Sequence, residues 1–277
     1  MPYCKICGKE IPEGMSVCEE CAKRESFEVK GRKYWEGFGK SLELLPRLYF
    51  DFVSEKEYKK LLKDRDLRGK KVIDLGAGYP PPPKESPEKK LVPLASELQE
   101  ILEKKGAKLI AVDVAEDPLE HQKKRGRETI LASVFQLPFK DESIDGGAVI
   151  LNLFNSSFKG EGGKEVYITL KECEKILREV YRVLQKGSFV IISNWGYAIS
   201  TIDNLIKISG PEENEIITPE MIQKLAEKIG FKNVKDIPLE EKRIELGKKL
   251  MLESFPEALR ERITVELKAP GALFMEK

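Results

Sequence analysis

The chain has 277 residues, of which 41% are hydrophobic and 34% are charged, with 48 lysines and arginines against 47 aspartates and glutamates. This composition excludes a disordered chain, no apolar run is long enough to span a membrane, and the balanced charge excludes a global attraction to nucleic acid. The first residues lack the basic and apolar segments of a secretory signal, so we expect a cytoplasmic protein. Abundant lysine and glutamate with a single histidine are typical of hyperthermophile surfaces, which suggests a thermophile source.

We divide the chain into a head over residues 1–25, a helical bridge or lid over residues 26–68 and a larger domain over residues 69–277. The head contains two C-x-x-C pairs separated by ten residues: Cys4, Cys7, Cys18 and Cys21. This spacing lets four thiolates converge on one metal ion. Zinc is favoured, although tetrahedral sulfur ligation also fits iron. Two disulfides are the alternative, which a cytosolic location disfavours.

A closed site of four thiolates has no open coordination position, so we expect a structural zinc ribbon that serves folding or contact. The end of the head and the start of the bridge mix basic and aromatic residues: Lys23, Arg24, Lys30, Arg32 and Lys33 with Phe27, Tyr34, Trp35 and Phe38. This mixture suits contacts with RNA phosphates and bases. A helix that packs its aromatic side chains on the larger domain is an equally good interpretation.

From residue 69 onward, strand-like and helix-like segments alternate. The expected strands cover residues 71–75, 108–112, 129–132, 144–153, 188–193, 231–237 and a last stretch ending at 271–275. The expected helices lie before Gly106, over residues 164–184, from Thr218 to Gly230 and over residues 240–254. This alternation predicts an α/β, Rossmann-like, doubly wound and mostly parallel seven-stranded sheet, with ligands at the carboxyl ends of its strands. Cys173 is expected in the core.

A glycine turn directly follows the first strand, in the sequence Asp74, Leu75, Gly76, Ala77, Gly78. Glycines there allow the backbone to approach a ligand closely, although such a turn alone is weak evidence. Asp113 ends the second strand, where a carboxylate can accept both hydroxyls of a ribose. A dinucleotide-dependent oxidoreductase is disfavoured because the third glycine of its fingerprint is absent and no helix begins at once.

The order of these features resembles the class I S-adenosylmethionine-dependent methyltransferases of the ubiquinone and menaquinone biosynthesis type, called type 11. The resemblance covers roughly residues 69–193 and rests on five motifs: VIDLGAG at 72–78, AVD at 111–113, LPF at 137–139, SID at 143–145 and RVLQKG at 182–187. Two features depart from the family pattern. Ser133 stands where an acidic residue is usual, and Tyr79 with the prolines at 80–83 follows the glycine turn, either as a pocket wall or as a stabilised loop.

The resemblance implies S-adenosylmethionine as the cofactor and assigns its contacts. By this analogy Gly76 and Gly78 line the methionine part, Asp74 and Ala77 of the same turn also bind the cofactor, and Asp113 holds the ribose. Val114 packs on the adenine. Ser133 and Val134 border the adenine, and Leu151 and Asn152 lie beneath the donor.

The methyl acceptor is not readable from the sequence. RNA is the leading hypothesis, a small molecule is the second, and a non-catalytic cofactor-binding or interaction protein is the third. Methyl transfer requires alignment of a nucleophile more than a base, and no catalytic residue is identified. Candidates for substrate contact are Asn152, Asn155, Asn194 and Trp195, whereas His121 is expected at the surface. We expect no membrane partner, and the sequence does not indicate an oligomeric state.

Overall fold

The structure is a computed structural model of the chain. It describes residues 10, 51–80, 96–151, 153–155, 157–159, 165–203, 206–212, 215–253 and 255–277. The expected zinc ribbon, with Cys4, Cys7, Cys18 and Cys21, and the bridge up to residue 50 lie outside the described residues and remain predictions.

Seven strands form the expected mostly parallel sheet, in the order β3-β2-β1-β4-β7-β10-β9, and an eighth strand, β8, pairs with β7. Their bounds are β1 (Lys71–Leu75), β2 (Lys108–Asp113), β3 (Glu128–Leu131), β4 (Gly147–Leu151), β7 (Phe189–Ile202), β8 (Ile206–Ser209), β9 (Lys232–Asp236) and β10 (Ile263–Glu276). The neighbouring pairs from β3 to β7 are parallel, whereas β10 is antiparallel to both β7 and β9. The order reverses between β1 and β4, which is where open α/β sheets bind ligands. The described part also contains a separate hairpin of β5 (Ser157–Lys159) and β6 (Glu165–Tyr167).

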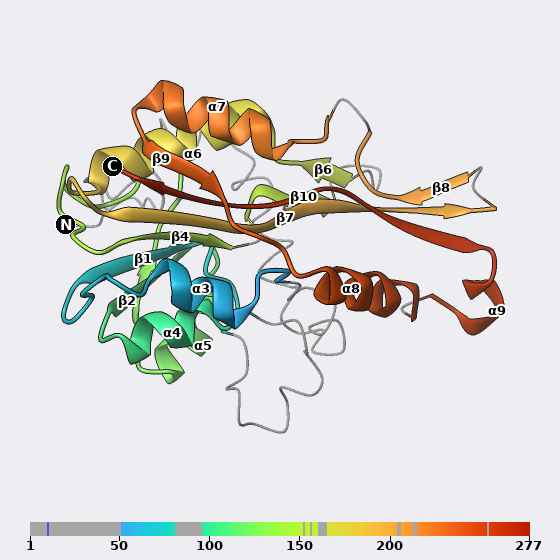
Figure 1. Cartoon of the computed structure of the whole chain (residues 1–277), viewed down its shortest axis with the longest axis horizontal. Coiled ribbons are helices and arrows are strands. Elements are labelled where there is room, and N and C mark those ends of the chain that lie inside the picture. The colour runs from blue at the N-terminus through green and yellow to red at the C-terminus, as the bar shows by residue number, and fades with distance from the viewer. Residues whose placement is uncertain are drawn as a thin grey trace.

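Helices cover both faces of the sheet (Figure 1). One face carries α3 (Glu55–Leu61), α4 (Leu98–Lys104) and α5 (Glu116–Lys124), and the other carries α6 (Leu170–Val183) and α7 (Pro219–Ile229). The last helices, α8 (Glu241–Glu253) and α9 (Glu257–Arg260), follow β9 and lie beside the extended parts of β7 and β10. A short 3-10 helix, Leu153–Asn155, follows β4.

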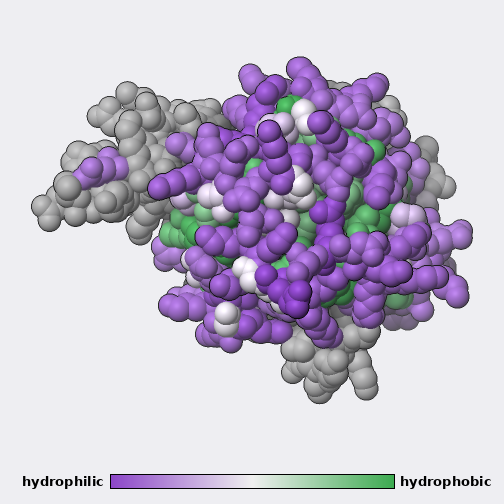
Figure 2. All heavy atoms as spheres, turned by 60° about the vertical axis from the view of Figure 1, so that its left-hand side comes forward, coloured by the Kyte–Doolittle hydropathy of each residue, from purple (hydrophilic) through white to green (hydrophobic). Residues whose placement is uncertain are grey.

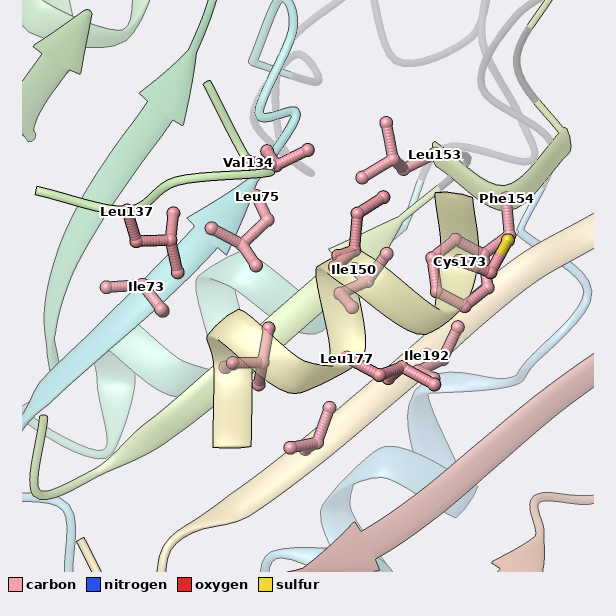
Figure 3. Packing of buried hydrophobic residues seen from close by; sticks show 14 of the residues in the cluster. Ile73, Leu75, Val134, Leu137, Ile150, Leu153, Phe154, Cys173, Leu177 and Ile192 are labelled. Atoms are coloured by element: carbon pink, nitrogen blue, oxygen red, sulfur yellow. The ribbon is translucent and has the colours of Figure 1, made fainter. Parts of the chain in front are cut away.

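The sheet separates two hydrophobic clusters. The first joins the sheet to α6 and α7, and the second joins it to α3 and α4. In Figure 3, Ile73 and Leu75 of β1 lie with Val134 and Leu137, while Phe154 lies beside Cys173 of α6. Cys173 is completely buried, which confirms its expected place in the core.

The boundaries of α7 follow the signals in the sequence. The side chain of Thr218 accepts a hydrogen bond from the Met221 amide at 3.4 Å, and Pro219 is the first helical residue. Gly230 ends the helix with a φ of 119°, a left-handed conformation that a side chain disfavours. In α6, Thr169 and Glu172 form a reciprocal capping box, and this helix begins later than expected, at Leu170.

The strands expected over 188–193 and 144–153 have different bounds in the structure. The first of them continues to Ile202, because it pairs there with the last strand, which begins at Ile263 (Figure 1). Hydrogen bonds between the two antiparallel strands hold this extension. The apolar sequence pattern indicates only strands that are buried on both faces. The strand expected over 144–153 is shorter, since Ile144 makes only an isolated bridge with Leu184 and Leu153 already belongs to the 3-10 helix.

Hydrophilic side chains cover most of the face in Figure 2, and hydrophobic ones appear there in small separate patches. Among the described residues, no helix has the length and apolar character needed to span a membrane.

Candidate active site

The glycine turn follows β1 and lies against the end of β2. The amides of Gly76 and Ala77 both donate to the carbonyl oxygen of Val112, at 2.9 and 3.1 Å. Gly76 and Gly78 have φ values of 64° and 53°, which favour residues without a side chain. A Cβ atom on Gly76 would lie 3.2 Å from Cδ1 of Leu153. The backbone conformation therefore favours glycine at this position, and the tight contact with Leu153 adds to this preference.

Asp113 closes the turn from the neighbouring strand. Its Oδ2 accepts a hydrogen bond from the Gly78 amide at 2.9 Å, and its Oδ1 accepts one from the Ala115 amide at 2.9 Å. Burial raises the pKa of Asp113, and the backbone amides oppose that shift. Each carboxylate oxygen has two lone pairs, so this side chain retains capacity for donors from a ligand.

Asp74 lies one residue before the end of β1 and is only 2% exposed. The side-chain amide of Gln99 donates to its Oδ2, whereas Oδ1 has no hydrogen-bond partner within the described part of the chain. Burial raises the pKa of Asp74 to about 6, and the charge of Arg127 opposes this increase. A buried carboxylate oxygen without a donor is costly, and a ligand that brings an N–H group would satisfy it.

Three polar residues that the sequence did not single out connect Asp74 to the glycine turn. Arg127 Nη1 donates to Oε1 of Gln99 and Oε1 of Gln122, each at 2.7 Å. Gln122 Nε2 in turn donates to the carbonyl oxygens of Ala77 and Gly78, at 3.1 and 2.9 Å. Gln99 and Gln122 are buried on α4 and α5, and such buried glutamines in amphipathic helices were the available signal.

The residues assigned to the adenine follow the ends of β2 and β3. The Ala132 amide donates to the backbone carbonyl oxygen of Asp113 at 2.9 Å, and this bond holds the segment after β3 beside Asp113. Ser133 is buried, and its hydroxyl accepts a hydrogen bond from the Phe135 amide at 3.1 Å. Val114 and Val134 are buried as well, and Val134 lies close to Leu75 (Figure 3).

The remaining candidates lie at the end of β4, in the 3-10 helix after it, and in β7 just beyond its last pair with β4. Leu151 is the last residue of β4, is half-buried and pairs with Ser193 of β7. Asn155 belongs to the 3-10 helix, and Asn194 and Trp195 belong to β7. Asn152 lies outside the described residues. The structure thus joins Asp74, the glycine turn and Asp113 by hydrogen bonds, directly or through the network of Gln99, Arg127 and Gln122, and leaves the acceptor contacts as predictions.

Tyr79 connects the segment after the glycine turn to α5. Its hydroxyl donates a hydrogen bond to Oδ2 of Asp117, and burial together with this carboxylate raises the pKa of Tyr79. The ring of Tyr79 meets that of His121 edge to face, with centroids 5.1 Å apart. His121, expected at the surface, is therefore half-buried against Tyr79.

The LPF segment at 137–139 is held to α6 by Arg182. This guanidinium donates to the carbonyl oxygens of Leu137 and Phe139, at 3.0 and 2.9 Å. Glu179, also on α6, accepts a hydrogen bond from the Leu137 amide at 2.8 Å. The contacts of this motif position the loop that follows Ser133 and Val134.

A second polar cluster, unnoticed in the sequence, lies where β7 ends its pairing with β4. The Tyr58 hydroxyl donates to Oδ2 of Asp51 at 2.8 Å and lies 2.8 Å from the Ser193 hydroxyl, which donates to Oδ1 of Asp51 at 3.0 Å. All three side chains are buried, and burial raises the pKa of Tyr58. Arg243 of α8 donates to the Asp51 carbonyl at 2.7 Å, so the cluster joins α8 to the segment before α3 and to β7.

Comparison with known proteins gives a family for the middle of the chain. Residues 94–192 match the family model described as a methyltransferase domain. The search of curated proteins gave no match.

Several solved structures share the fold. Magnesium protoporphyrin IX methyltransferase from Synechocystis PCC 6803, with bound SAM, has a TM-score of 0.50 and 11% identity, over 92% of this chain and 99% of that one. Phosphoethanolamine N-methyltransferase 2 from Haemonchus contortus has a TM-score of 0.50 and 14% identity, over 92% of this chain and 61% of that one. The cyclase SpnF has a TM-score of 0.53 and 12% identity, over 89% of this chain and 95% of that one. The chain therefore carries a methyltransferase domain, matched over residues 94–192, on the fold of the S-adenosylmethionine-dependent methyltransferases.

Proposed function

We propose that the protein binds S-adenosylmethionine at the carboxyl ends of β1, β2 and β4 and transfers its methyl group to a small-molecule acceptor. The observation that carries this proposal is the joined arrangement of the Gly78 amide, the Asp113 carboxylate and the open Oδ1 of Asp74. The matched methyltransferase domain and the shared fold support it.

The residues present fit this cofactor. Asp113 has lone pairs for the two ribose hydroxyls, and a Cβ atom on Gly76 would crowd Leu153. Asp74 offers a buried anionic oxygen to the ammonium end of the methionine part. Val114, Ser133 and Val134 would border the adenine, and Leu151 and Asn152 would lie beneath the donor.

When bound, S-adenosylmethionine supplies a methyl group already activated by its sulfonium sulfur. Transfer to the acceptor nucleophile would break the carbon–sulfur bond, and the sulfur would keep the electron pair of that bond in the thioether product. The chain then has to align the acceptor with this axis and exclude water, which a closed site can do without a base. We assign this task to the residues after β4 and to those of β7 just beyond its last pair with β4.

Two observations favour a small-molecule acceptor. The neighbours with TM-scores of 0.50 are named for a porphyrin and for phosphoethanolamine, and the chain has almost balanced charge. RNA, the leading hypothesis from the sequence, rests on basic and aromatic residues over 23–38, which lie outside the described residues. It remains the alternative that the experiment must separate.

The test uses the full chain and S-adenosylmethionine with a labelled methyl group. The protein is incubated with separated metabolite, RNA and protein fractions, with Asp113→Ala as the matched control. We expect label in the metabolite fraction and a much lower incorporation with the variant. Label confined to RNA would reject the small-molecule acceptor, and donor binding without transfer to any fraction would favour a non-catalytic cofactor-binding protein.

That last outcome matters because the same fold also occurs in a protein named as a cyclase.

For the head of the chain we infer a structural zinc ion held by Cys4, Cys7, Cys18 and Cys21. The spacing of the two C-x-x-C pairs supports this assignment.

A further inference from the structure

Arg127 precedes β3 and contacts residues of two helices, α4 and α5. Its side chain is 7% exposed, and its guanidinium forms two bonds with Glu103 of α4, at 2.7 and 3.1 Å. The same guanidinium donates to the amide oxygens of Gln99 and Gln122, each at 2.7 Å. One buried cation therefore connects α4 and α5 across the side of the candidate donor site.

The chemistry of arginine determines how both glutamines are oriented. A guanidinium only donates, so each glutamine must turn its oxygen toward Arg127 and its nitrogen away from it. The nitrogen of Gln99 then faces Asp74, to which it donates. The nitrogen of Gln122 faces the turn and donates to the carbonyl oxygens of Ala77 and Gly78.

These contacts act on the parts of the site that would hold the donor. The hydrogen bond from Gln99 occupies Oδ2 of Asp74 and leaves Oδ1 as the open oxygen. The two bonds from Gln122 hold the carbonyl side of the turn, while the Gly78 amide on its other side donates to Asp113. The turn is thus fixed from both sides before any ligand arrives.

We propose that Arg127 is a positioning residue of the donor site, which acts through Gln99 and Gln122 to orient the Asp74 carboxylate and the glycine turn. This inference rests on the proposed function, since it names residues that prepare the same site. Arg127 itself makes no contact with the donor in this account. The sequence motifs of the family did not include any of the three residues.

An alternative explanation is that Arg127 only stabilises the packing of α4 through its ion pair with Glu103. Gln122→Met separates the two explanations. It removes the bonds to the turn but leaves the Arg127–Glu103 pair in place. Arg127→Lys provides a second comparison, because lysine keeps the charge but lacks the planar fork that reaches both amides.

The experiment is a calorimetric titration of the full chain with S-adenosylhomocysteine, with thermal unfolding of each variant recorded alongside. The variants are Arg127→Met, Arg127→Lys and Gln122→Met. The matched control is Arg262→Met, which removes another arginine bound by two hydrogen bonds to a carboxylate, that of Asp203. We expect Arg127→Met and Gln122→Met to weaken binding about tenfold or more, and the control to stay within about twofold.

The pH dependence of binding adds a second measurement. A simple loss of stability would not change the pH at which the affinity declines. Arg127 lowers the pKa of Asp74, while Asp113 and Glu103 raise it. In Arg127→Met the pH below which affinity declines should therefore move upward, and Arg127→Lys should restore part of this shift.

The outcomes separate the two proposals. If the wild type does not bind S-adenosylhomocysteine, the proposed function fails. If the wild type binds and both Arg127→Met and Gln122→Met bind equally well, the positioning role is wrong while the proposed function stands. If Arg127→Met does not fold, the affinity of Gln122→Met relative to Arg262→Met decides.

Discussion

The Gly78 amide donates a hydrogen bond to Oδ2 of Asp113 at 2.9 Å, although the two residues are 35 positions apart in the chain. This bond joins the end of β1 to the end of β2, and β1 is also one of the two strands, β1 and β4, between which the strand order of the sheet reverses. Because the carboxylate keeps lone pairs for further donors, the bond prepares Asp113 for a ligand without using its capacity.

Asp74→Asn should stabilise the protein at neutral pH and weaken donor binding. Burial raises the pKa of Asp74 from its ordinary value of 3.8 to about 6, so the stability that depends on its proton is present below pH 3.8 and is lost as the pH rises through 6. The neutral amide avoids this cost, and we expect a gain of about 1–3 kcal/mol at pH 7.5 that vanishes near pH 4. Denaturant unfolding at the two pH values measures it.

Asp203→Asn is the matched control for the sign of this effect. The Asp203 carboxylate is exposed and paired with Arg262, which lowers the pKa of Asp203. Its variant should lose stability at neutral pH rather than gain it, and donor affinity should not change. An Asp74→Asn protein that is less stable than the wild type at pH 7.5 would show that the buried charge is not a cost.

Gly76→Ala should lower both stability and donor affinity. Its φ of 64° disfavours any side chain, and the added carbon would lie 3.2 Å from Leu153. We expect a loss of about 1–2 kcal/mol from the left-handed backbone, plus a further loss from the contact. Denaturant unfolding and calorimetry measure the two effects.

Gly69→Ala provides the comparison for the glycine variant. Gly69 has a similar φ of 71°, but its added carbon would meet no atom within 4 Å. This variant should lose only the conformational part of the stability and keep its donor affinity. Equal effects of the two substitutions on binding would contradict the assigned place of Gly76.

Tyr58→Phe should destabilise the protein through the buried cluster with Asp51 and Ser193. The substitution removes a donor 2.8 Å from a buried carboxylate, a loss of about 1.5–3 kcal/mol for a hydrogen bond to a charged group. Ser193→Ala and the double variant complete a cycle, in which we expect a coupling of about 1 kcal/mol between the hydroxyls. Unfolding free energies that add within about 0.5 kcal/mol would show that the hydroxyls act independently.

The head should contain one zinc ion per chain. Mass spectrometry of metals should find this ratio in the purified protein, and Cys18→Ser should lower it because closed sites need all four thiolates. Thiol titration after unfolding with a chelator should find all five cysteines free. A single free thiol and no metal would instead indicate two disulfides in the head.

Local patterns predicted the fold well where burial determines them. The strand over residues 71–75 and the caps of α7 at Thr218 and Gly230 agree with the structure, because a short apolar run and a capping residue act within a few positions. The extension of β7 to Ile202 could not be seen, since its pairing with β10 joins residues 61 or more positions apart and needs no apolar run.

The same distinction applies to the candidate site. The glycines of the turn come directly after β1, and Asp113 is the last residue of β2. The ends of neighbouring parallel strands lie close together, so the sequence was enough to predict that these residues are neighbours. Arg127 and the two glutamines come from three separate elements, and their contacts arise only when those elements pack. The Asp51–Ser193 contact spans 142 positions and has no motif in either segment.

The most direct test of the account is a calorimetric titration of the wild type and Asp113→Ala with S-adenosylmethionine. We predict one site per chain in the wild type and an affinity at least about tenfold weaker in the variant, which loses the ribose contact and the acceptor of the Gly78 amide. No binding by the folded wild type, or equal binding by the two proteins, would contradict the proposed donor site.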